Sequence, residues 1–217
     1  LRQPGSNIKP FIYSAALENG FTAASLVSGA PIVIEDSISG DWRPQNYSRK
    51  VFGPTRLREA LSKSLNLVSV RLVRALGVEA VRDYLEKFGF DRARLPQGLS
   101  LALGSATVTP IEIARAYGVF ANGGYLVEPF FIARVEDPSG QIVEYANRQM
   151  LCSGCAIPIS ESSDSSQPLP DLRFSQQVVS PENAFILDSM MREVIRSGTG
   201  RAARSLHRDD LAGKTGT

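Results

Sequence analysis

The chain has 217 residues, of which 43% are apolar, and this is enough for one substantial core or two unequal lobes. Its net charge of +2 gives no reason to expect nucleic acid or an anionic membrane as a partner. One histidine and two cysteines are too few for a zinc site unless carboxylates complete it, so we expect no metal site. We also expect no cofactor.

The first predicted helix covers residues 6–20, where apolar residues recur at helical spacing before an Asn-Gly stop. Pro10 is tolerated only near the start of a helix, so Ser6 is expected in or just before the first turn. Residues 21–50 are rich in Gly, Pro, Ser and Asp and are predicted as loops, with a possible short strand at 31–34.

The helical period returns from residue 55 and continues to Gly77. A second amphipathic helix is predicted over 78–88, closed by a glycine. Residues 109–112, TPIE, form a capping box with proline at the first helical position, and the helix that they start is expected to end at 122–124.

Strand-like alternation covers 130–135, and the turn sequence DPSG leads into a second strand at 142–145. Residues 152–175 are polar and serine-rich, which predicts a mobile loop or an insertion. The sequence SPEN at 180–183 starts a long helix to about residue 197. The final LAGKTGT is predicted to be a strand, so helices are expected to dominate the middle of the chain, with strand material near its C-terminal end.

Three short patterns occur once each along the chain: Ser6-Asn7-Ile8-Lys9, Ser64-Leu65-Asn66 and Lys214-Thr215-Gly216-Thr217. Alone, each has an ordinary interpretation: a helix cap, a turn between helices and a solvated strand end. A K-T-G triplet is expected by chance only roughly 0.02 times in a chain of this composition. The ordered co-occurrence of the three patterns therefore favours a shared catalytic site.

A serine hydroxyl becomes a good nucleophile only when a base takes its proton. The single histidine, His207, lies in the polar stretch LHRDD and is better explained as a surface residue than as that base. Lys9 follows Ser6 by three positions, so on a helix its amine is expected to reach the hydroxyl. Burial and a second cation, Lys214, would lower the pKa of Lys9 enough to make it neutral.

The remaining motif residues supply polar groups that such a site needs. Asn66 offers both a donor and an acceptor, which suits holding Lys9 while binding a substrate amide. Ser64 can relay a proton to a leaving amine, and the helix start at Ser6 offers N–H groups to a developing oxyanion. The third motif adds hydroxyls and a strand edge for an extended peptide: Thr215, Gly216 and Thr217.

The ordered trio resembles the signature of penicillin-binding proteins and serine β-lactamases. The flanking stretches narrow the resemblance to the transpeptidase domain of class A (bifunctional) penicillin-binding proteins: RQPGSNIKPFIYSAALENG, NYSRK, GPTRLREALSKSLNLVSVRL, LGSATVTPIEIARAYGVFANGG and RSGTGRAA…DLAGKTGT. The similarity covers the chain apart from 152–175. It implies an α+β fold of the penicillin-binding and serine β-lactamase type, in which a helical subdomain lies beside a five-stranded antiparallel sheet, here incomplete at both ends.

The resemblance also implies the chemistry. Ser6 would be the acylated nucleophile and Lys9 its base, and the N–H groups of Ser6 and Thr217 would form the oxyanion hole. The serine would attack the D-Ala-D-Ala amide of a peptidoglycan stem peptide, and an amine from a neighbouring stem would resolve the acyl-enzyme into a crosslink. β-Lactams would acylate the same serine.

Family domains have strands before the first motif and after the third. We therefore expect residues 1–217 to be part of a transpeptidase domain, without the glycosyltransferase domain and membrane anchor of the parent protein. The expected location is the periplasmic face of the bacterial inner membrane, with outer-membrane or divisome and elongasome activators as possible partners. Alone, the chain is expected to expose the edge of the 211–217 strand and not to fold stably.

Several alternatives stay open. A class A β-lactamase would carry an E-x-x-L-N pattern, and no glutamate here has it. A D,D-carboxypeptidase shares the motifs and differs only in passing the acyl group to water, whereas a non-catalytic penicillin sensor or scaffold would have little reason to keep Ser6 and both lysines. Cys152 and Cys155 form a C-x-x-C without a helix start, so a local disulfide is favoured over a redox pair.

Overall fold

The computed structural model describes residues 1–35, 40–146, 149–150 and 173–216. Helices dominate this part of the chain: α1 (Lys9–Glu18), α2 (Leu57–Ser62), α3 (Asn66–Leu76), α4 (Val78–Glu86), α5 (Pro110–Ala121) and α6 (Pro181–Arg196). Short 3-10 turns complete the helical part: η1 (Gly5–Ile8), η2 (Arg92–Arg94), η3 (Leu99–Leu103) and η4 (Arg201–Leu206). The predicted helices are therefore confirmed, with ends shifted by a few residues, except that the segment expected to be helical from 55 to 77 is divided into α2 and α3 by the junction at 63–65.

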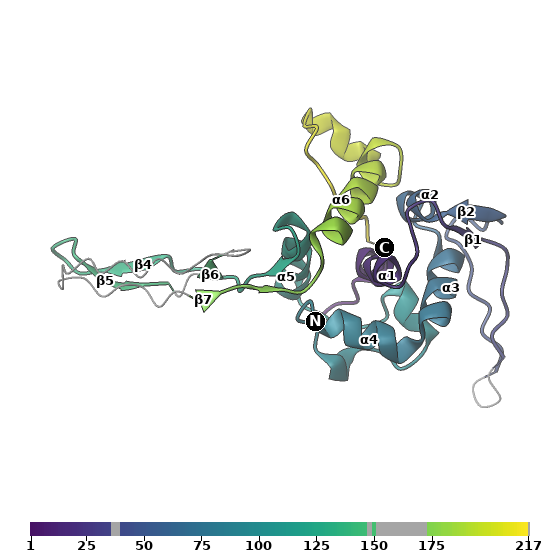
Figure 1. The fold of residues 1–217 in the computed structure, drawn as a ribbon, viewed down its shortest axis with the longest axis horizontal. Helices are drawn as coiled ribbons and strands as arrows, with labels where there is room; N and C mark the ends of the chain where they lie inside the picture. The colour runs from purple at the N-terminus through teal and green to yellow at the C-terminus, as the bar shows by residue number, and fades with distance from the viewer. Residues whose placement is uncertain (36–39, 147–148, 151–172, 217) are drawn as a thin grey trace.

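Helix α1 lies at the centre of the helical body and contacts α2, α3, α4 and α6 (Figure 1). Every residue of α1 from Lys9 to Ala16 is buried, so the apolar stripe expected there is part of a helix enclosed on all sides. Phe11 packs against the rings of four other aromatic residues: Phe88, Phe90, Tyr117 and Phe120. The helix that begins with Lys9 of the first motif is thus fixed by the core.

Helix ends follow the capping signals in the sequence. At the start of α5, the Thr109 hydroxyl accepts a hydrogen bond from the Glu112 N–H, while the Glu112 carboxylate accepts from the Thr109 N–H at 2.7 Å. At the start of α6, the Ser180 hydroxyl accepts from the Asn183 N–H. Both expected starts are confirmed, because these side chains satisfy backbone donors that a first helical turn leaves free.

The strands form only two-stranded ladders in the described part of the chain. The antiparallel pairs are β1 (Leu26–Ser28) with β2 (Pro54–Arg56), β3 (Tyr125–Leu126) with β8 (Gln176–Gln177), and β4 (Arg134–Glu136) with β5 (Ile142–Tyr145); β6 (Gln149–Met150) pairs in parallel with β7 (Arg173–Phe174). The β4–β5 ribbon extends away from the helices (Figure 1). The five-stranded sheet of the family is not present among these residues.

Two strand predictions are wrong. Of residues 31–34, only Ile34 forms an isolated bridge, with Trp42, and the strand of this region is β1. Residues 211–216 form no strand, because no neighbouring described strand offers them a ladder partner. The strand expected at 130–135 begins only at Arg134. The loop expected at 152–175, including Cys152 and Cys155, lies almost entirely outside the described residues.

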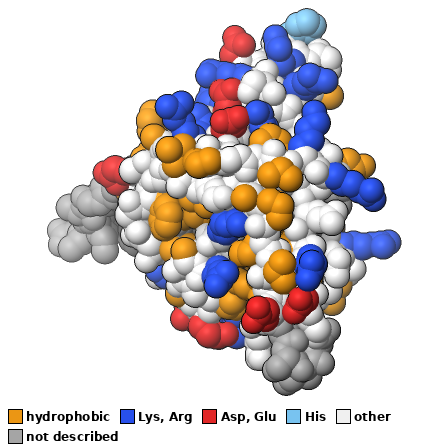
Figure 2. Space-filling view, turned by 90° about the vertical axis from the view of Figure 1, so that its right-hand side faces the viewer, with side chains coloured by type: hydrophobic (Ala, Val, Ile, Leu, Met, Phe, Trp, Pro, Cys, Tyr) orange, Lys and Arg blue, Asp and Glu red, His pale blue; other side chains and the backbone are white. Residues whose placement is uncertain are grey.

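One face of the molecule carries both positive and negative side chains (Figure 2). On the face shown in Figure 2, Lys and Arg side chains alternate with Asp, Glu and apolar groups. Within the described part of the chain, no helix combines the length and apolarity that crossing a bilayer requires. The same part holds no group of three or more His, Cys, Asp or Glu side chains placed to ligate a metal ion.

Candidate active site

Ser6 lies in the tight turn η1 that leads directly into α1. The Lys9 N–H donates to the Ser6 carbonyl oxygen, which closes a 3-10 turn between the two residues. Residues three apart are eclipsed in such a turn, so both side chains lie on the same side of the chain. Gly5 starts the turn with a φ of 54°, a left-handed conformation that glycine adopts without strain.

Two other segments hold this turn in place. The Gly5 N–H donates to the Gly104 carbonyl oxygen at 3.3 Å, and the Tyr117 hydroxyl donates to the Asn7 carbonyl oxygen at 3.0 Å. Gly104 has a φ of 74°, and a Cβ at this position would lie 2.0 Å from the Gly5 oxygen. The position of Ser6 therefore depends on close backbone packing that only glycine permits at residue 104.

The second motif lies in the junction between α2 and α3. Ser64 adopts a φ of 55°, which is unusual for a residue other than glycine, and its N–H donates to the Leu61 carbonyl oxygen. Such strain persists only where the surrounding structure fixes it, and it is enriched at functional sites. Asn66 then begins α3, so both polar side chains of the motif are carried by a rigid junction.

The amine of Lys9 joins the first motif to the second. It is fully buried and lies 2.9 Å from the Ser64 carbonyl oxygen, 3.2 Å from Ser64 Oγ and 2.7 Å from Asn66 Oδ1. The contact expected between Lys9 and the Ser6 hydroxyl is not among these bonds. The two carbonyl-type oxygens are stronger acceptors for an amine, and nucleophile–base contacts are often loose without substrate.

Lys214 brings the third motif to the same hydroxyl. Its amine donates to Ser64 Oγ at 2.8 Å and to the Thr215 carbonyl oxygen at 3.0 Å. The pKa of Lys9 is lowered to about 7, mainly because the amine is buried and to a smaller extent because of the positive charge of Lys214. Burial lowers the pKa of Lys214 to about 8. Both lysines are therefore far easier to deprotonate than lysines in water.

The third motif also touches the first. A Cβ on Gly216 would lie 2.7 Å from Asn7 Nδ2 and 3.2 Å from the Pro4 carbonyl oxygen, so residue 216 passes close beside the Ser6 turn. Thr217 lies outside the described residues. The structure thus places Ser6, Lys9, Ser64, Asn66, Lys214, Thr215 and Gly216 around one site.

Thr199 is a member of this site that the sequence analysis did not identify. Its hydroxyl lies 2.6 Å from that of Thr215, and its N–H donates to the Ser62 carbonyl oxygen at 3.0 Å. The stretch RSGTG around it contributes to the family resemblance, but a threonine that follows a helix end has no characteristic spacing from the three motifs that would predict a role in the site. Its role becomes visible only when the end of α6 is seen beside the third motif.

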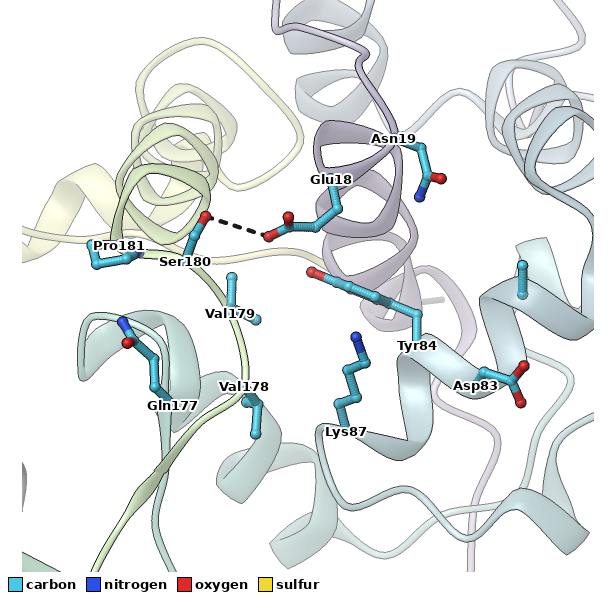
Figure 3. A pocket seen from close by; sticks show the side chains of 11 residues that line it. Glu18, Asn19, Asp83, Tyr84, Lys87, Gln177, Val178, Val179, Ser180 and Pro181 are labelled. Carbon is cyan, nitrogen blue, oxygen red and sulfur yellow. Dashed lines mark hydrogen bonds between the residues drawn. The ribbon is translucent and has the colours of Figure 1, made fainter.

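Among the clefts on the described part of the chain, two bear on the location of the site. One, of about 540 Å³, is lined by residues of two motifs, Asn7 and Gly216. The other, of about 580 Å³, lies around Glu18, Tyr84 and Lys87 and contains no motif residue (Figure 3). Glu18 ends the helix that Lys9 begins, which separates this second cleft from the lysine by about 14 Å along the axis. Of these two clefts, the first adjoins the motif residues.

The chain is similar to known proteins along its whole length. Residues 2–217 match the family described as penicillin binding protein transpeptidase domain. The whole chain is 45% identical to penicillin-binding protein 1A of Pseudomonas aeruginosa and 38% identical to that of Escherichia coli, of which it covers 29% and 31%. It also covers 34% of a crystal structure of penicillin-binding protein 1A from Haemophilus influenzae, at 36% identity and a TM-score of 0.88. The chain therefore spans about a third of the length of these relatives.

Proposed function

Since the chain belongs to the penicillin-binding protein transpeptidase family, we propose that it carries the serine acyl-transfer site of a peptidoglycan D,D-transpeptidase. The proposed substrate is a stem peptide that ends in D-Ala-D-Ala, and the proposed acceptor is an amine of a neighbouring stem. β-Lactams are proposed to acylate the same serine, Ser6. Residues 1–217 would be part of the transpeptidase domain of a longer, membrane-anchored protein on the periplasmic side of the inner membrane.

The hydrogen-bond count of the Lys9 amine is the observation that carries this proposal. The Ser64 carbonyl oxygen and Asn66 Oδ1 can only accept hydrogen bonds. In neutral Lys9 these two acceptors use both hydrogens, so the lone pair is left for a hydroxyl. A buried amine held in this way, with its pKa lowered to about 7, is suited to take a proton from Ser6.

Ser64 is proposed to carry that proton onward. Its hydroxyl accepts from Lys214, which leaves its own hydrogen free to point to the Lys9 lone pair or to a leaving amine. Lys214 would remain positively charged while it does so. The arrangement supports a relay in which Lys9 and Ser64 exchange protons without a histidine.

The proposed acylation begins when Ser6 Oγ attacks the carbonyl carbon between the two D-alanines and its proton passes to Lys9. The C–N bond then breaks. The departing amine takes the hydroxyl proton of Ser64, and Ser64 recovers a proton from Lys9, which is neutral again. In the second half, an acceptor amine attacks the ester, its proton passes to Lys9, and Lys9 returns a proton to the Ser6 oxygen.

The third motif is proposed to bind the charged end of the substrate. A D-Ala-D-Ala terminus carries a carboxylate, which the Lys214 ammonium and the Thr215 hydroxyl would attract. The oxyanion is proposed to bind the N–H groups of Ser6 and Thr217. Gly216 would let the substrate backbone approach closely. Activator proteins at the outer membrane or in the division and elongation machinery are further proposed partners.

Labelled penicillin tests the proposal directly. The full-length protein should form a covalent adduct that mass spectrometry locates on Ser6, and Ser6→Ala should abolish it. If the wild-type protein formed no adduct, a non-catalytic scaffold would be the remaining interpretation. With a D-Ala-D-Ala donor and an amine acceptor, crosslinked product supports transpeptidation, whereas hydrolysed donor alone would assign a D,D-carboxypeptidase.

A further inference from the structure

The N-terminus of α3 is capped from a distant loop. Asn46 Oδ1 accepts hydrogen bonds from the N–H of Asn66 at 2.9 Å and from that of Leu67 at 3.3 Å. The residue that precedes the helix, Leu65, contributes no side-chain cap. The Asn46 side chain thus satisfies donors that the first turn of α3 would otherwise leave unpaired in a buried position.

Asn46 is itself held firmly. It is 5% exposed, and its Nδ2 donates to the Lys50 carbonyl oxygen at 3.0 Å. Its own carbonyl oxygen accepts from the Arg49 N–H at 2.9 Å, and Arg49 adopts a φ of 56°. The loop is therefore closed around Asn46, so the carbonyl end of the side chain is kept pointing at α3.

Gln45, the residue before Asn46, fixes the orientation of the Asn66 side chain. Asn66 Nδ2 donates to the Gln45 carbonyl oxygen at 2.8 Å, while Asn66 Oδ1 accepts from the Lys9 amine at 2.7 Å. A reversed amide would place oxygen against oxygen at Gln45 and hydrogen against the donors of Lys9. One amide hydrogen remains free, which suits the binding of a substrate carbonyl oxygen.

From these contacts we infer that residues 45–46 are a positioning segment of the active site, and that Asn46 is a positioning residue that acts through Asn66 on Lys9. Asn46 fixes where the Asn66 backbone lies, and the Gln45 carbonyl fixes which way its amide faces. Together they keep an acceptor at the Lys9 amine and so direct its lone pair toward a hydroxyl. The inference rests on the proposed function, because it assigns Lys9 the role of base.

The test uses the full-length protein and the kinetics of penicillin acylation, separated into binding and the chemical step. Asn46→Ala should slow the chemical step roughly 10- to 100-fold, because a displaced base costs about that much, while penicillin binding changes far less. Asn46→Asp keeps the acceptor and should retain most of the rate. Rates are compared at the pH optimum of each variant, because a new carboxylate near Lys9 would raise the pKa of that lysine.

Ser180→Ala is the matched control. It removes a side-chain cap from α6, at a comparable cost in stability, but touches no group that contacts Lys9. Equal acylation by Asn46→Ala and Ser180→Ala, at equal loss of thermal stability, would overturn the inference, and so would an Asn46→Asp variant as slow as Asn46→Ala. Should Asn46→Ala not fold, Asn46→Ser takes its place and should be slower than Asn46→Asp. A wild-type protein that forms no adduct would instead refute the proposed function itself.

Discussion

The two lysine amines of the site share one hydroxyl oxygen, that of Ser64, at 3.2 Å from Lys9 and 2.8 Å from Lys214. Two full charges this close repel each other, and burial removes the water that would screen them. One of the lysines therefore loses its proton first. Lys9, with a pKa of about 7 against about 8 for Lys214, is the one that becomes neutral while Lys214 stays charged.

The first prediction is a bell-shaped pH dependence of acylation. The rate should rise as Lys9 loses its proton near pH 7 and fall as Lys214 loses its charge near pH 8, although the two limits belong to the coupled pair. Lys214→Met removes the neighbouring charge, so the pKa of Lys9 should increase and the acidic limb should move to higher pH. The second-order rate constant for penicillin, measured across the pH range, would contradict the coupling if the acidic limb stayed in place.

Gly104 provides a second prediction at the scale of single residues. Gly104→Ala combines a φ of 74° with a Cβ placed 2.0 Å from the Gly5 oxygen, so the Ser6 turn has to shift. Gly77→Ala is the matched control, because it has a φ of 88° but nothing within 4 Å of the new Cβ. Both should lose roughly 1 kcal/mol or more of stability from backbone strain.

Only Gly104→Ala should also slow penicillin acylation. Thermal unfolding and acylation rates, measured on the same two full-length variants, separate the two effects. If both variants acylated at the wild-type rate, the packing of residue 104 against Gly5 would have no part in placing the nucleophile.

At the scale of helices and strands, the sequence predicts those features that depend on residues close together in the chain, such as helix ends. The capping box at Thr109 and the glycines that follow helices mark helix ends through contacts between residues a few positions apart. The predicted ends of α5 and α4 therefore lie within a few residues of the observed ones. Strand β1 depends on β2, about 28 residues later in the chain, and its own sequence gives no sign of that partner. The strand was therefore expected at 31–34 instead.

The end of α6 carries the third prediction. Beyond Arg196, the chain packs on Ser62 and brings the Thr199 hydroxyl to within 2.6 Å of that of Thr215. A hydrogen bond donated by Thr199 would leave the hydrogen of Thr215 free for a substrate carboxylate. Thr199→Val, which keeps the shape and removes the hydroxyl, should weaken acylation by roughly 0.5–1.5 kcal/mol, the usual net value of one hydrogen bond.

Thr199→Ser is the control, because it keeps the hydroxyl and should acylate at close to the wild-type rate. The comparison should be repeated with a penicillin methyl ester, which lacks the carboxylate. The difference between the Val variant and the wild type should then disappear. A difference of the same size with the ester would show that Thr199 acts on the fold of the site and not on recognition of the carboxylate.

At the scale of the whole molecule, the three motifs predicted most members of the candidate site, but neither Thr199 nor the contacts that join the motifs. The order of Ser6, Ser64 and Lys214 along the chain indicated a shared site, and helix spacing placed Lys9 beside Ser6. The bonds from Lys9 to Ser64 and Asn66, and the cap from Asn46, join residues 20 to 57 positions apart. Such contacts depend on how helices and loops pack, which no local pattern encodes.

The last prediction concerns the 217-residue chain expressed by itself. Its core is closed around α1, but residues 211–216 have no ladder partner in the described structure, although they carry Lys214. The β4–β5 ribbon is also only two-stranded and exposes Val143, and the chain just before it exposes Phe131 and Ile132. Isolated ribbons of this kind are marginal in water, and unpaired edges favour association.

We therefore expect the isolated chain to unfold without a single cooperative transition. Far-ultraviolet circular dichroism, which follows the helices, and near-ultraviolet signals from the packed aromatic residues around Phe11 should change at different temperatures. In the full-length protein, the labelled-penicillin adduct serves as the control for an intact site. Coincident, sharp transitions in the isolated chain would mean that the helical core holds the third motif in place without a sheet beside it. Residues 211–216 would then owe their position to contacts such as that between Lys214 and Ser64, not to strand pairing.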